Sequence, residues 1–127
     1  MSRIDEIQGE ICSLNNQISE YEDNITELLE ARDYIVGELQ RVEDVSSEIR
    51  VYDTTKGDQW LGNLNLEMQD NKDYIFRTIS TFSMKTENFI NSIDVAVGRL
   101  RAMISDCKGR ICELESQMSE LAIDVSV

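Results

Sequence analysis

Apolar residues recur along the first half of the chain at alternating steps of three and four positions. Between residues 4 and 49, only two of the fourteen positions in this series, Arg32 and Ser46, are not apolar. Such a long series of heptads is typical of one long α-helix that packs a narrow apolar seam against another helix. The apolar members are Ile4, Ile7, Ile11, Leu14, Ile18, Tyr21, Ile25, Leu28, Ile35, Leu39, Val42 and Ile49.

The second half, from about Leu64, has a comparable but less regular apolar stripe. From Ile93 onward the alternation of four and three continues to the end of the chain, whereas two apolar doublets widen the stripe before it. A wider stripe predicts contact with more than one neighbouring helix. The members are Ile75, Ile79, Phe82, Phe89, Ile93, Val97, Leu100, Ile104, Cys107, Ile111, Leu114, Met118, Leu121 and Val125.

The wide part of the stripe is a candidate interface with a partner helix. It contains the doublets Ile75/Phe76 and Phe89/Ile90, with Phe82 between them. All five residues would also suit a hydrophobic core. We favour a shared role, in which one residue of each doublet faces the core and the other faces the partner.

Two such helices can bury their seams by folding onto each other, so we expect an all-α fold. The predicted architecture is a single domain over 1–127, a long antiparallel hairpin that resembles a coiled coil. Helix 1 covers about 3–52, the turn lies near 53–62, and helix 2 covers about 63–124. With the bend near residue 59, facing positions have numbers that sum to about 120.

The amino-acid composition favours helices and argues against some classes of binding partner. The chain is 41% hydrophobic but only 6% aromatic, with no Pro, which does not suit a β-rich domain. A net charge of −13 argues against nucleic acid or an anionic membrane surface as partner. Residues 1–53 carry fourteen Asp and Glu against four Arg. This acidic face is either a solvated helix surface or a means of steering a basic partner.

The sequence contains neither an apolar stretch long enough for a transmembrane helix nor a signal-peptide pattern. We therefore expect no membrane insertion, and synthesis and folding in the cytoplasm, without excluding export of the folded protein. Cys12, Cys107 and Cys112 have neither a disulfide-framework nor a zinc-site spacing, and we expect small buried or boundary thiols. A Cys12–Cys112 disulfide is the geometric alternative.

Nothing in the sequence predicts catalysis. The chain has no His, and no phosphate-binding, nucleophile or calcium-binding motif appears. Asp70 and Asp73 stand three residues apart and would reach a common metal, but a solvated pair is the favoured interpretation. We expect no enzyme activity and no catalytic, cofactor-binding or metal-binding residue.

The stretch "TTKGDQWLGNLN", residues 54–65, contains the only tryptophan, Trp60. One hypothesis is that its ring covers Leu61 and Leu64 at the end of the hairpin core. The other is that Trp60, Leu61 and Gly62 form a recognition motif. An aromatic side chain at a hairpin tip can bury about 150–250 Å² against another molecule. A glycine at Gly62 lets a neighbouring backbone or ring approach.

A Trp-x-Gly motif at the bend of a helical hairpin resembles the WXG family of proteins handled by type VII secretion. The motif here is "WLGN". The chain is more similar to small helical proteins encoded beside LXG-domain polymorphic toxins in Gram-positive bacteria. The segments that carry this likeness are "ISEYEDNITELLEAR" in the first helix and "FINSIDVAVGRL" in the second.

The resemblance implies an adaptor, or targeting chaperone, that binds the helical N-terminal domain of an LXG toxin and promotes its export. Partners would include the secretion machinery and a second small helical protein. The C-terminal stretch "MSELAIDVSV" lacks the Tyr of a Y-x-x-x-[DE] export signal, and we interpret the match at Tyr34–Glu38 as coincidental. Any such signal would then come from the partner. The alternative function is a homodimeric coiled-coil tether without a role in secretion.

Overall fold

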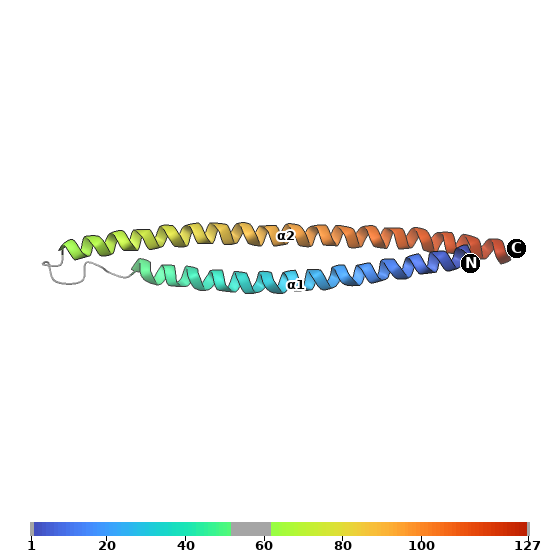
Figure 1. The fold of residues 1–127 in the computed structure, drawn as a ribbon, viewed down its shortest axis with the longest axis horizontal. Coiled ribbons are helices and arrows are strands. Elements are labelled where there is room, and N and C mark those ends of the chain that lie inside the picture. Colours follow the sequence, from blue (N-terminus) through green and yellow to red (C-terminus); the bar gives the residue numbers. More distant parts are fainter. Residues whose placement is uncertain (1, 52–61, 127) are drawn as a thin grey trace. The chain divides into compact units, whose positions relative to one another are not determined.

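The computed structural model contains two long α-helices. It describes residues 2–51 and 62–126, with side chains for 2–50 and 66–123. Helix α1 covers Arg3–Val51 and helix α2 covers Gly62–Ser126, and no strand occurs within the described ranges (Figure 1). The all-α helical hairpin predicted from the sequence is confirmed.

The start of α1 is fixed by local contacts. The backbone N–H of Asp5 donates to Ser2 Oγ at 3.2 Å, which satisfies one of the free amides of the first turn. Asp5 and Glu6 place negative charge at the positive end of the helix dipole, and Arg50 places positive charge in the last turn. The charged residues at both ends of α1 therefore have the signs that stabilise the helix dipole.

The chain divides into two compact units, which we describe separately. Unit 1 consists of Met1–Glu30 and Ile93–Val127, and unit 2 consists of Ala31–Ser92. In each unit a segment of α1 packs against a segment of α2. The interpretation of residues 1–127 as a single domain stays a prediction.

Unit 1 has the regular core that the sequence predicts. The blue start of α1 lies beside the red end of α2 (Figure 1). Its contacts join Glu10 to Arg110 and Gln17 to Cys107, so residue numbers rise on one helix as they fall on the other. These pairs sum to 120 and 124, which confirms the predicted antiparallel register. The buried residues are Ile7, Ile18, Ile25, Ile93, Val97, Ile104, Cys107 and Leu114.

Unit 2 has a much smaller buried core. Of the buried apolar residues among the described side chains, only Leu39 and Ile90 belong to it. On α1, the predicted seam is correct, because Ile35, Val42 and Ile49 are half-buried at their expected positions.

On α2 the predicted stripe is correct within unit 2 at Ile79, which is half-buried, and wrong at its other three positions. Ile75, Phe82 and Phe89 were assigned to the stripe, yet they are 40%, 50% and 56% exposed. The regular alternation continued back from Ile93 leads to half-buried and buried positions of which only Ile79 was assigned to the stripe and three are polar: Lys72, Phe76, Ile79, Ser83, Thr86 and Ile90. The seam therefore lies beside the most hydrophobic line of this segment.

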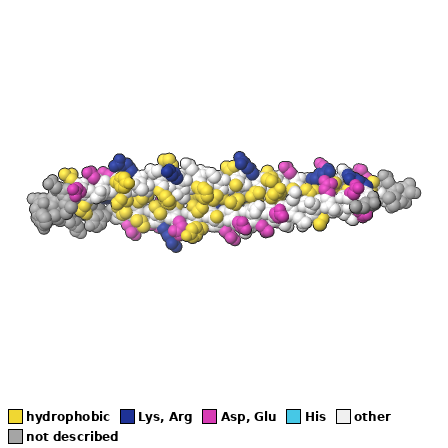
Figure 2. Space-filling model, viewed as in Figure 1, with side chains coloured by type: hydrophobic (Ala, Val, Ile, Leu, Met, Phe, Trp, Pro, Cys, Tyr) yellow, Lys and Arg dark blue, Asp and Glu magenta, His cyan; other side chains and the backbone are white. Residues whose placement is uncertain are grey.

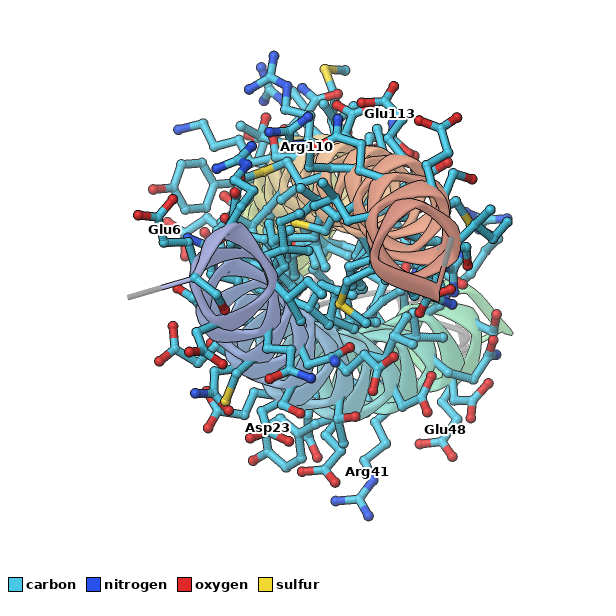
Figure 3. The ribbon with its side chains drawn as sticks, turned by 90° about the vertical axis from the view of Figure 1, so that its right-hand side faces the viewer. Glu6, Asp23, Arg41, Glu48, Arg110 and Glu113 are labelled. Atoms are coloured by element: carbon cyan, nitrogen blue, oxygen red, sulfur yellow. The ribbon has the colours of Figure 1, made fainter. Side chains whose placement is uncertain are left out.

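Charged side chains lie on the outer faces of the helices. Asp23, Arg41 and Glu48 point away from the space between the helices, while the apolar side chains lie within it (Figure 3). Some hydrophobic side chains nevertheless reach the surface along the junction of the helices, on the face shown in Figure 2. These exposed side chains identify the surface considered next.

Candidate functional site

The Trp-x-Gly segment lies mostly outside the described residues. Trp60 and Leu61 precede α2, and Gly62 is its first residue. The partner-binding role of Trp60, Leu61 and Gly62 stays a prediction, as does the alternative in which the ring covers the end of the hairpin.

The two apolar doublets of α2 each divide between the core and the surface. Phe76 and Ile90 face α1, whereas Ile75 and Phe89 are exposed, and Phe82 is exposed between them. This inward and outward division agrees with the shared role expected from the sequence. Contact between the outward residues and a partner stays a prediction.

The outward residues lie along one side of α2. Ile75, Phe82 and Phe89 are spaced by seven, so they lie almost on one line at about 100° per residue. Tyr34 and Val45 of α1, eleven residues apart, share a face in the same way and are also exposed.

Two adjoining hollows, which we call the flank groove, include Phe82 and Phe89 of the α2 line but not Ile75, together with Tyr34 and Val45. The larger has a volume of about 440 Å³ and an almost entirely apolar lining. It is lined by Tyr34, Ile35, Glu38, Leu39, Phe82, Lys85, Thr86 and Phe89. The smaller, of about 200 Å³, is lined by Glu38, Arg41, Val42, Val45 and Ile79. Both lie wholly in unit 2 and share Glu38.

The lining of the flank groove carries one acidic and two basic side chains. Arg41 forms an ion pair with Glu38 at 3.4 Å, and Lys85 stands on the α2 side of the larger hollow. A third hollow, on α2 alone, shares Phe82 and Lys85 with the flank groove. Phe82 is therefore accessible from two sides, which suits the anchoring residue of an interface.

Sequence analysis missed part of this surface. Tyr34 was considered only as part of the coincidental match at Tyr34–Glu38, but it is 70% exposed beside the groove. Val45 was not singled out at all. The sequence signal that could have revealed this surface is that Tyr34 and Val45 are aromatic and apolar, lie outside the seam positions and share one face of the helix.

Phe76 is a seam residue of unit 2, and two cationic side chains lie close to its ring. The guanidinium of Arg50 lies 5.7 Å and the ammonium of Lys72 lies 5.8 Å from the ring centroid. Lys72 Nζ also donates to the backbone oxygen of Arg50 at 3.2 Å. Cation–π contacts of this kind stabilise partly exposed aromatic rings, so polar groups here replace apolar packing.

The polar contacts of unit 1 fix its register. Arg110 binds Glu113 on its own helix and Glu10 on α1, each at 3.3 Å. The hydrogen bond that the Arg110 guanidinium donates to Glu113 and the charge of Glu10 raise the pKa of Arg110. Arg110 and Glu113 lie together on α2 in Figure 3. The half-buried contact between Arg110 and Glu10 joins the two helices of unit 1.

The cysteines fit the sequence expectation only in part. All three are free thiols. Cys107 is buried, as expected, and its Sγ contacts Gln17 Oε1 at 3.7 Å. The expectation of a buried or boundary position is wrong for Cys12 and Cys112, which are exposed because each follows a seam residue on the outer face of its helix.

Within residues 2–51 and 62–126, no group of three or more His, Cys, Asp or Glu side chains is placed to bind a metal ion. Neither helix, in its described part, has the length and apolarity needed to cross a membrane. The main feature of the described surface is thus an apolar groove suited to binding another chain.

Comparison with known proteins identifies the family. The family model described as YwqH-like matches residues 2–123. The chain belongs to the YwqH-like family. Neither a curated protein nor a solved structure matches it. The YwqH-like match includes all of α1, the segment between the helices and all but the last three residues of α2.

Proposed function

We propose that the chain is a non-enzymatic adaptor that binds the helical N-terminal domain of an LXG toxin and promotes its export by type VII secretion. The observation that carries this proposal is the YwqH-like match over residues 2–123, because YwqH-like proteins are associated with LXG toxin systems. A helical hairpin with an exposed apolar groove is compatible with binding another helical chain.

In the proposed mechanism, two different parts of the chain make the contacts with the toxin and with the other partners. The flank groove offers exposed aromatic side chains of the type that dominate binding energy at interfaces. Trp60, Leu61 and Gly62 form a WXG-like motif, which we assign to contact with the secretion machinery or with a second small helical partner. In this proposal the chain meets the toxin before export.

Export of the toxin from the source bacterium tests the proposal. Deleting the gene for this chain should abolish appearance of the LXG toxin in the culture medium while the toxin is still made. Wild type should restore export, Trp60→Ala should restore less, and Leu66→Ala, an exposed control 65% accessible, should restore it fully. Immunoblots of medium and cells measure each strain.

Unchanged export in the deletion strain would overturn the proposal. Full restoration by Trp60→Ala would leave the adaptor role standing but remove the WXG-like role of that residue.

A further inference from the structure

The seam of unit 2 is less apolar than that of unit 1. The seam positions of unit 1 are all apolar if Tyr21 and Cys107 are included. In unit 2, five of the twelve are polar: Arg32, Ser46, Lys72, Ser83 and Thr86. Polar side chains at such positions contribute little burial energy. The intramolecular packing of unit 2 is therefore weaker than its length would allow.

The apolar residues missing from this seam lie on its flank. Counted along α2, the exposed line of Ile75, Phe82 and Phe89 runs one residue before the seam positions Phe76, Ser83 and Ile90. In a two-helix seam the flanking positions are usually charged, whereas in bundles of three or more helices they join the core. Unit 2 thus has the pattern of a larger bundle while it contains only two helix segments.

The exposed surface is large enough to anchor a partner. Taking about 200 Å² for an aromatic side chain, the exposed parts of Tyr34, Phe82 and Phe89 amount to about 350 Å². A stable interface buries about 800 Å² on each partner. The rings would thus supply the centre of an interface, and the neighbouring helix surfaces would supply its rim.

We propose that unit 2 is an incomplete helical bundle, and that an amphipathic helix of the toxin's N-terminal domain completes it by packing into the flank groove. That helix would present apolar residues at seven-residue intervals to Phe82 and Phe89, and a net basic polar face to the surrounding acidic chain. The identity of the partner rests on the proposed function, whereas the incompleteness of unit 2 does not.

Charge selects this occupant over a second copy of the chain. The chain carries 25 acidic against 12 basic residues, and a second copy would bring the same net charge of −13. Like charges of this size oppose association and a basic helix is attracted. The groove lining itself carries the Glu38–Arg41 ion pair and Lys85, so the attraction of a basic helix comes from the rest of the acidic chain.

Substitutions on two sides of α2 test the groove. Phe82→Glu and Phe89→Glu should each raise the Kd for the purified N-terminal domain of the LXG toxin at least tenfold. Each substitution places a charge in the apolar interface. Met84→Glu is the matched control, since Met84 is 63% exposed in the same unit but nearly opposite Ile75 on the helix. All three variants should retain the helical content of wild type by circular dichroism.

Hydrogen exchange tests the incompleteness of unit 2 without relying on affinity. In the free chain, amides of residues 35–49 and 72–90 should exchange faster than those of 7–28 and 93–118, and adding the toxin domain should slow them severalfold. Equal protection of the two sets in the free chain would overturn the proposal, as would unchanged affinity in both Phe variants.

The outcomes separate this inference from the proposed function. If wild type binds no toxin domain, the proposed function fails. If wild type binds and both Phe variants bind equally well, the adaptor role survives and the groove is not its interface. A homodimer of the free chain that Phe82→Glu dissociates would make a second copy the occupant and overturn the choice of partner.

Discussion

Two side chains, Ile7 and Leu114, are completely buried in the described part of the chain, and both belong to unit 1. Because deleting buried methyl groups removes transfer energy and leaves a cavity, Leu114→Ala should lower the free energy of unfolding by about 2–5 kcal/mol. The exposed Leu66 provides the control, since Leu66→Ala should change it by less than about 0.5 kcal/mol. Urea titrations followed by circular dichroism measure both, and equal losses would contradict the assigned core.

Single residues also show where hydrophobicity misleads. Phe82 and Phe89 are large apolar residues, and a search for apolar periodicity places them in the seam. The structure exposes them and puts Ser83 and Ile90 in the seam instead. Adjacent residues on a helix are about 100° apart, so an assignment wrong by one position moves a side chain from the core to the flank.

At the scale of the element, the sequence predicted the helical fold, the antiparallel register and the seam of α1 correctly. Those features depend on a regular alternation that extends over many heptads. The α2 seam in unit 2 could have been found by continuing the alternation backward from Ile93, which leads to Ile90, Thr86 and Ser83. The flank groove could not, because it depends on how two helices juxtapose side chains such as Tyr34 and Phe82.

The polar seam of unit 2 makes a prediction about the element itself. Ser83 is half-buried at a seam position, so Ser83→Leu should raise the free energy of unfolding by about 1 kcal/mol, part of the gain from full burial of Leu. Ser92→Leu is the control, because it makes the same change on an exposed face of α2. Its effect on stability measures the part that comes from the higher helix propensity of Leu. Thermal unfolding of both variants is the measurement. If Ser92→Leu stabilised the chain as much as Ser83→Leu, the seam assignment would be wrong.

At the scale of the whole molecule, charge is concentrated in one unit. Residues 1–30 and 93–127 carry fourteen Asp and Glu against five Lys and Arg, whereas residues 31–92 carry eleven against seven. In our account the strongly acidic unit steers a basic partner and the apolar groove of unit 2 holds it. Charge complementarity of this kind changes the association rate more than the final affinity.

The number of chains in the functional assembly distinguishes an adaptor from a structural tether. A homodimeric coiled-coil tether would use the apolar surface for a second copy, whereas an adaptor would keep it for the toxin. The family match favours the adaptor, since YwqH-like proteins are associated with LXG toxin systems. The sequence of one chain does not specify which assembly forms, because exposed apolar residues serve either.

The measurement that tests the central claim most directly is the light-scattering mass of the chain after co-expression with the N-terminal domain of an LXG toxin. We expect a stable complex whose mass contains the 14.6 kDa chain together with the toxin domain. A discrete homodimer of twice 14.6 kDa that contains no toxin domain would contradict the adaptor and support the coiled-coil tether.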